Sequence, residues 1–203
     1  IHASVSGTVK AVEPRPYSMG GNITSVVIEN DMQDEVSEEV QVPADPNALS
    51  VEEMVEIVKN AGIVGMGGAG FPTHVKLSPK NPDSITDVIV NCAECEPYLT
   101  SDYRRMMEEP EKLIAGLKVM LKLFPNAKGT LAVEDNKPDA IALLKKLTKD
   151  ETDISVAALH TKYPQGSERH LIYAVTGRAI NSSMLPADAG CIVDNLSLIH
   201  ISE

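Results

Sequence analysis

Five glycines fall within the nine residues 62–70, and this run constrains the fold more than any other stretch. Glycine destabilises the interior of helices and strands, so the run predicts a loop. A flexible linker would be rich in serine and other polar residues, whereas this run is interrupted by apolar residues, namely Ile63, Val64, Met66, Ala69 and Phe71. Unshielded backbone N–H groups can cradle an anion or lie against a flat ring. We interpret the run as a ligand-binding loop, with the nearby Lys76 as a cation for a phosphate.

The composition excludes several classes of protein. The chain of 203 residues is 43% hydrophobic and 23% charged, as in globular proteins. A net charge of −11 and an aromatic content of 3% argue against binding of nucleic acid, which requires lysine, arginine and stacking rings. No apolar run approaches the ~20 residues of a membrane span, and we expect no signal peptide. Three cysteines, an odd number, favour a reducing compartment.

The first part of the chain differs from the rest. Residues 1–42 contain alternating polar and apolar runs around 4–12 and 23–28, which predict short strands joined by glycine turns. Residues 43–47 then form a turn-rich joint. Ser50 and Glu53 have the spacing of a capping box, which predicts a helix that ends at Gly62.

Strand and helix patterns alternate in the following part. Apolar strands are predicted at 88–90, 130–133 and 154–159, and amphipathic helices are predicted from Pro110, over 138–149 and over 168–175. Such alternation is typical of an α/β fold, with a mostly parallel sheet and flanking helices.

Three polar clusters follow the predicted strands directly, at residues 91–96, 134–136 and 163–168. Ligands of parallel α/β sheets bind outside the carboxyl ends of the strands. Any one cluster alone would indicate a turn, but three clusters at one sheet edge, with the glycine loop, predict a nucleotide-type pocket.

These residues resemble the flavin-binding subunit of respiratory NADH dehydrogenases and, more specifically, the RnfC subunit of the Rnf electron-transport complex. The shared motifs are the loop 65–73 and the segment 91–97, while 95–100, 134–138 and 162–166 are similar to the Rnf protein in particular. The resemblance implies a small β module like a partial barrel-sandwich at 1–42. It further implies an FMN- and NADH-binding α/β domain at 43–195, followed by a tail at 196–203 that does not resemble the family.

The resemblance also implies ligand residues. The residues expected to bind FMN are Gly65, Gly67, Gly68, Gly70, Lys76, Asn91, Glu94, Asp194 and Asn195. The residues expected to face NADH are Phe71, Glu96 and Glu168. No catalytic side chain is expected, since hydride transfer to a flavin needs no protein base at that step. The chain departs from the family at Asp194, where asparagine is usual, and at Leu77–Pro79, where respiratory relatives carry an aromatic residue.

The implied function is oxidation of NADH with FMN, as an electron-transfer module of a membrane-associated Rnf-type complex. Its implied partners are the other subunits, and its implied location is cytoplasmic, on the inner face of the cell membrane. Two alternatives stay open: a corrin reductase flavoprotein of the same family, and a docking module that keeps the fold without electron transfer.

The cysteines bear on metal binding. Cys92 and Cys95 have the spacing of a zinc or redox pair, but no second pair exists and the five histidines are scattered, so we expect no metal site. Three cysteines cannot supply the four thiolates of an iron–sulfur cluster. Such clusters are therefore expected only in a full-length chain of the family.

Overall fold

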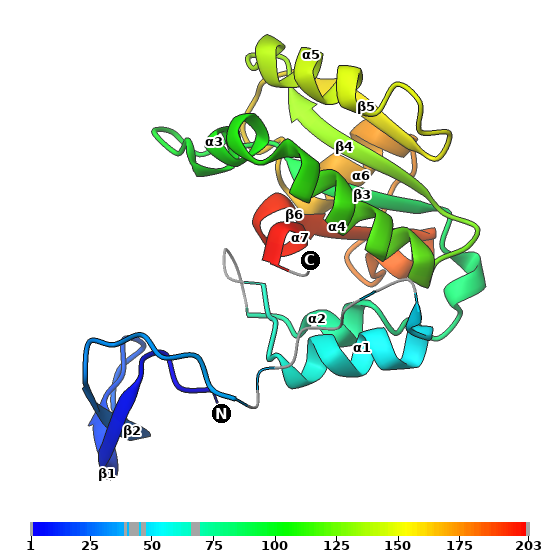
Figure 1. Ribbon diagram of the computed structural model, residues 1–203. Coiled ribbons are helices and arrows are strands. Elements are labelled where there is room, and N and C mark those ends of the chain that lie inside the picture. The colour runs from blue at the N-terminus through cyan, green and yellow to red at the C-terminus, as the bar shows by residue number, and fades with distance from the viewer. Residues whose placement is uncertain (1, 39, 41–44, 46–47, 66–69, 202–203) are drawn as a thin grey trace. The chain divides into compact units, whose positions relative to one another are not determined.

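The computed structural model describes residues 2–38, 40, 45, 48–65 and 70–201. Contacts within the chain divide it into two units, Ile1–Asn47 and Ala48–Glu203 (Figure 1). Most of the predicted joint at 43–47 lies outside the described residues.

The first unit contains an antiparallel hairpin of β1 (Gly7–Pro16) and β2 (Asn22–Asn30). Gly20 and Gly21 form its turn with φ angles of 95° and 75°, a region of backbone conformation that favours glycine. A bulge between Val9 and Ala11 shifts the pairing register by one residue. The β module predicted at the start of the chain therefore contains a two-stranded hairpin.

The second unit is built on a parallel sheet of four strands in the order β5-β4-β3-β6. The strands are β3 (Asp87–Cys92), β4 (Lys128–Glu134), β5 (Ile154–Leu159) and β6 (Cys191–Asn195). The predicted α/β class with a parallel sheet is confirmed. The strand β6 was not predicted, and its pairing with β3 places β3 in the interior of the sheet.

Helices occupy the connections between strands. The longer ones are α1 (Val51–Asn60), α3 (Ser101–Glu108), α4 (Pro110–Leu123), α5 (Pro138–Leu147) and α6 (Glu168–Thr176). The short ones are α2 (Thr73–Lys76), η2 (Pro82–Ser84), η3 (Pro186–Ala189) and α7 (Leu196–Ile201). Pro110 and Pro138 begin α4 and α5, where the missing N–H of proline costs no hydrogen bond. The sequence analysis predicted neither α3 nor α7.

Both faces of the sheet are buried. Val88 and Val90 of β3 belong to the larger core, which contains residues of α1, α3, α4 and α5, whereas Ile89 belongs to a second core with Leu171 and Ile172 of α6. Alternate residues of a strand point to opposite faces, so the helices cover the sheet on both sides (Figure 1). No helix in the described part of the chain is long and apolar enough to cross a membrane.

Candidate functional site

The structure brings the three polar clusters together. A pocket of about 720 Å³ lies at the carboxyl ends of β3, β4 and β5 and takes its lining from the loop after each strand and from the first turns of α3 and α5. Its lining residues are Glu94, Cys95, Glu96, Pro97, Tyr98, Leu99, Thr100, Tyr103, Glu134, Asn136, Lys137, Pro138, Asp139, Thr161, Lys162 and Tyr163.

Glu94 lies in the wall of this pocket with its carboxylate held by the start of α3. The backbone N–H of Asp102 donates to Oε1 at 2.9 Å, and that of Tyr103 donates to Oε2 at 3.3 Å. Burial raises the pKa of Glu94, and these hydrogen bonds oppose the shift because they favour the ionised form. The carboxylate is thus fixed in position before any ligand arrives.

Asn91 ties β3 to the loop before α6. Its Nδ2 donates to the carbonyl of Gly166 at 2.8 Å, and its Oδ1 accepts from the N–H of Ala93 at 3.1 Å. The sequence analysis assigned this amide to the flavin. In the structure its acceptor and one donor bond to backbone groups, so Asn91 also shapes the site.

Lys76 lies between two carboxylates. Its Nζ donates to the carbonyl of Val193 at 2.6 Å and lies 3.2 Å from Asp194 Oδ1 and 3.6 Å from Glu168 Oε1. The structure therefore joins Lys76 and Asp194, both expected to bind FMN, with Glu168, expected to face NADH. The sequence analysis treated Lys76 as a cation for a phosphate. It did not foresee these pairs, because β6, which carries Asp194, was not predicted.

Asp194 is fully buried in β6. Its contact with Lys76 is an ion pair without hydrogen-bond geometry, and neither carboxylate oxygen has a hydrogen-bond partner among the described residues. Burial raises the pKa of Asp194, while the charge of Lys76 acts in the opposite direction. Asp194 therefore holds polar capacity that the described part of the chain does not satisfy.

The glycine loop is closed at its base by pairing of the segments that flank it. Val64 and Pro72 form an antiparallel bridge, and the N–H of Gly65 donates to the carbonyl of Phe71 at 3.0 Å. Gly70 has a φ of 65°, in the region that favours glycine, and the ring of Phe71 is half exposed. Gly67 and Gly68 lie outside the described residues.

The remaining predicted residues lie at two separate places. Glu96 is exposed in the pocket wall, and its charge raises the pKa of the neighbouring Tyr163. Asn195 follows Asp194 at the end of β6, where its Nδ2 donates to Asp102 at 3.5 Å. Glu96 and Tyr163 belong to the pocket, whereas Asn195 is not among its lining residues.

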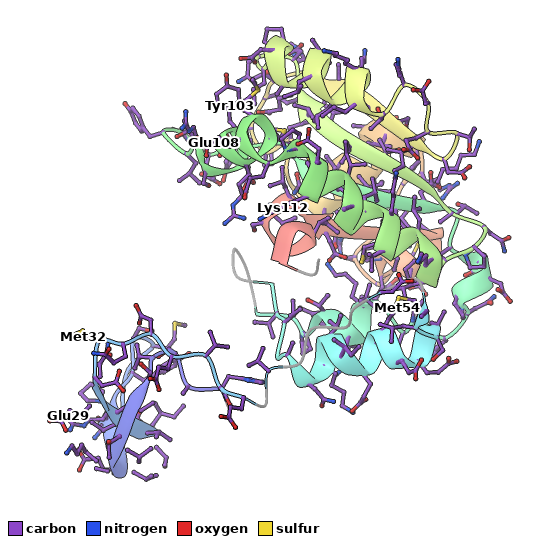
Figure 2. All side chains as sticks on the ribbon, viewed as in Figure 1. Glu29, Met32, Met54, Tyr103, Glu108 and Lys112 are labelled. Atoms are coloured by element: carbon purple, nitrogen blue, oxygen red, sulfur yellow. The ribbon has the colours of Figure 1, made fainter. Side chains whose placement is uncertain are left out.

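Tyr103 and Lys137 are among the pocket residues to which the sequence analysis gave no ligand role. Tyr103 lies on the side of α3 that meets α5, where its hydroxyl donates to Asp139 (Figure 2). The helix α3 was not predicted because it is short and polar. Lys137 lies beside Glu94 and Glu134. The sequence signal for its contact with Glu134 was the spacing of three residues at the start of a predicted helix.

Two family models match this chain. The family model described as the Nuo51 FMN-binding domain matches residues 58–201, and that described as the RnfC barrel sandwich hybrid domain matches residues 1–33. The second match agrees with the barrel-sandwich-like module expected at the start of the chain.

Curated relatives agree with these matches. The C subunit of the Na⁺-translocating ferredoxin:NAD⁺ oxidoreductase complex of Acetobacterium woodii is 47% identical over 196 residues, which are 97% of this chain and 44% of that protein. The C subunit of the proton-translocating ferredoxin:NAD⁺ oxidoreductase complex of Clostridium ljungdahlii is 47% identical over 205 residues, which are 100% of this chain and 44% of that protein. The chain thus spans less than half the length of these relatives.

Solved structures support the fold. An NAD⁺-reducing [NiFe]-hydrogenase matches with a TM-score of 0.64 in its H₂-reduced state, at 24% identity over 77% of this chain and 31% of that chain. Its air-oxidised state matches with a TM-score of 0.61 at the same identity, over 75% of this chain and 30% of that chain. The family match covers most of the chain, so this protein belongs to the family of the Nuo51 FMN-binding domain.

Proposed function

We propose that this chain is the FMN-carrying, NADH-oxidising module of an Rnf-type electron-transport complex, in which a hydride passes from NADH to FMN. The observation that carries the proposal is the convergence of three strand-end clusters on one pocket, within a domain whose family is described as FMN-binding. The names of the two curated relatives, both subunits of ferredoxin:NAD⁺ oxidoreductase complexes, point to the same activity.

Two places offer groups that suit FMN, namely the pocket and the pair of Lys76 and Asp194, which is not part of the pocket lining. A flavin nucleotide presents ring N–H and hydroxyl donors, carbonyl acceptors and a phosphate. The carboxylate oxygens of Asp194 and Glu134 Oε2 are buried acceptors without a hydrogen bond in the described part of the chain, and Lys76 is a cation held beside Asp194. When bound, FMN supplies the redox chemistry, accepting two electrons and releasing them singly.

The protein side chains would bind and orient the two ligands. Lys76 would neutralise the phosphate, with Gly65, Gly67, Gly68 and Gly70 allowing close approach of the backbone. Glu94 and Asp194 would accept from the flavin or its ribitol, and Asn91 and Asn195 would hold the surrounding loop and strand. Phe71, Glu96 and Glu168 would face NADH, and a carboxylate such as Glu96 suits ribose hydroxyls.

The physiological setting is part of the same proposal. The partners would be the other subunits of a membrane complex, since both curated relatives are named as subunits of ion-translocating complexes. The chain would attach to the inner face of the cell membrane through those subunits.

Flavin binding with a matched pair of lysine variants tests the proposal. Purified chain incubated with FMN should retain flavin and lose its flavin absorbance on anaerobic addition of NADH. Lys76→Met should weaken FMN binding by about tenfold or more, because a charged hydrogen bond to the phosphate is lost. Lys80→Met should bind FMN like the wild type, because Lys80 is exposed and outside the site. A wild-type chain that takes up no FMN, or a Lys76→Met chain that binds it normally, would contradict the assignment.

A further inference from the structure

A lysine lies between two buried carboxylates in the pocket wall. The Nζ of Lys137 is 3.8 Å from Glu134 Oε2 and 4.0 Å from Glu94 Oε2, and the three side chains are 11%, 1% and 3% exposed. Both distances exceed the length of a hydrogen bond. The buried charged cluster of Glu94, Glu134 and Lys137 is therefore held together by charge, with hydrogen-bonding capacity left over.

The two carboxylates differ in how that capacity is used. Both oxygens of Glu94 accept backbone N–H groups of α3. Glu134 Oε1 accepts only a long bond of 3.4 Å from the N–H of Lys162, and Oε2 has no hydrogen-bond partner among the described residues. Buried carboxylate oxygens are nearly always hydrogen-bonded, because the charged group loses its water on burial. Glu134 Oε2 is thus an acceptor that lacks a donor, in a residue that lines the pocket.

The charge around the pocket restricts what that donor can be. Its lining includes four carboxylates, those of Glu94, Glu96, Glu134 and Asp139, against the two lysines Lys137 and Lys162. A phosphate beside Glu134 would be repelled by this negative surplus. A neutral group with hydroxyl donors suits the position, and a ribose in contact with a carboxylate is such a group. Three tyrosines in the same lining offer rings against which a nucleoside packs.

We propose that Glu134 is a further ligand-binding residue, whose Oε2 accepts a hydrogen bond from a ribose hydroxyl of NADH. Lys137 is a positioning residue, because its charge attracts the Glu134 carboxylate within the pocket lining. This inference rests on the proposed function and adds to it a recognition group on β4, separate from Glu96 on the loop after β3.

Calorimetric titration of NAD⁺ into the FMN-loaded full chain is the primary test. Glu134→Met removes the acceptor at similar volume and should raise the Kd by about tenfold, the loss expected for a hydrogen bond to a charged group. Glu134→Gln, which keeps one acceptor oxygen, should have a smaller effect in the same direction. Asp150→Asn is the control, since Asp150 is an exposed carboxylate that does not line the pocket, and it should bind NAD⁺ like the wild type.

Deoxy analogues of NAD⁺, each lacking one ribose hydroxyl, identify the contact. At least one analogue should bind the wild type about tenfold more weakly than NAD⁺ does, and Glu134→Met should no longer distinguish that analogue from NAD⁺. Lys137→Met should raise the Kd for NAD⁺, and Lys137→Arg should restore it. The inference would be overturned if Glu134→Met bound NAD⁺ as tightly as the wild type does. It would also be overturned if Glu134→Met still bound each deoxy analogue more weakly than NAD⁺ by the same factor as the wild type.

The inference and the proposed function fail in different ways. A wild-type chain that retains no FMN, or whose flavin NADH does not bleach, overturns both. A wild-type chain that is reduced normally, together with a Glu134→Met chain of unchanged NAD⁺ affinity, overturns only the role of Glu134. Flavin content and thermal unfolding are measured for each variant. Values equal to those of the wild type exclude loss of the fold as the cause of weaker NAD⁺ binding.

Discussion

At the scale of single residues, Gly166 shows how closely the site is packed. A Cβ built on it would lie 2.8 Å from the carbonyl oxygen of Ala93, 3.3 Å from Cys95 Sγ and 3.6 Å from Asn91 Oδ1. We expect Gly166→Ala to destabilise the chain by about 1–3 kcal/mol, because backbone must move to admit the methyl group. Flavin affinity should fall with it, since Asn91 bonds the carbonyl of Gly166. Gly177→Ala is a control for the added methyl group, since nothing lies within 4 Å of its Cβ, although its φ of 74° adds strain of its own.

Chemical denaturation and FMN titration of Gly166→Ala measure both effects. A variant with wild-type stability and wild-type flavin affinity would show that the loop around Gly166 adapts freely, in conflict with a preformed site.

Asp194 makes stability depend on pH. Its pKa is raised in the folded chain, so it binds a proton more tightly there than in the unfolded chain, where the ordinary value is 3.8. The free energy of unfolding should therefore fall as pH rises from that value through the raised pKa, by about 1.4 kcal/mol for each unit of displacement. Asp194→Asn removes this dependence. The free energy of unfolding of Asp194→Asn should equal that of the wild type in acid, and it should exceed the wild-type value as the pH approaches neutrality.

Urea unfolding of the wild type and Asp194→Asn at several pH values checks this sign. Burial also raises the pKa of Glu94 and Asp102. The free energy of unfolding of Asp194→Asn should therefore still fall with rising pH, but less than that of the wild type. A difference between the two chains that does not change with pH would contradict the prediction.

At the scale of elements, the capping box of α1 is a local interaction that supports the larger core. The N–H of Glu53 donates to Ser50 Oγ at 3.2 Å, and the N–H of Ser50 donates to Glu53 Oε2 at 2.8 Å. The helix places Met54, 6% exposed, in the larger core (Figure 2). Ser50→Ala should lower the free energy of unfolding by about 1 kcal/mol, because the N-terminal N–H groups lose an acceptor. Thermal unfolding measures it, with Ser78→Ala, an exposed serine outside any helix, as control.

At the scale of the molecule, the distribution of charge predicts, under the proposed function, a preference for NADH over NADPH. The chain carries a net charge of −11, and the carboxylates that line the pocket outnumber its lysines. An added 2′-phosphate would be repelled, so we expect flavin reduction by NADH to exceed that by NADPH by about tenfold. Stopped-flow reduction with each nucleotide tests this. Glu96→Gln should lower the ratio of the NADH rate to the NADPH rate. Glu111→Gln, on the exposed side of α4, should leave that ratio unchanged. Equal rates with the two nucleotides in the wild type would contradict the expectation.

The cysteine count leads to a prediction about electron exit. Three cysteines, Cys92, Cys95 and Cys191, cannot supply the four thiolates of a cluster, and burial raises the pKa of Cys92 and Cys191, which disfavours the thiolate form that binds metal. Under NADH without oxygen, the flavin absorbance of the purified chain should stay bleached until an artificial acceptor is added. Stoichiometric iron and sulfide in the purified chain would contradict this prediction, because residues other than four cysteines would then have to bind a cluster.

The sequence by itself predicted most of the longer elements and the edge of the sheet at which the pocket lies. Periodicity predicted β3, β4 and β5 and the helices that begin at Pro110 and Pro138, because apolar strands and amphipathic helices leave local patterns. The polar residues after each strand indicated the pocket, because the carboxyl ends of parallel strands meet at one edge. The helix α3 is short and polar and β6 spans only five residues, so their patterns were too weak for prediction.

Only the tertiary structure decided which side chains meet. Lys76 and Asp194 are 118 positions apart in the sequence, and their pairing depends on β6 lying beside β3. The packing of separate loops at one sheet edge bonds Asn91 to Gly166 and leaves Glu134 Oε2 without a donor among the residues that the structure describes. Local sequence carries propensity and periodicity, whereas hydrogen-bond satisfaction and the burial of charge depend on neighbours that only the folded chain supplies.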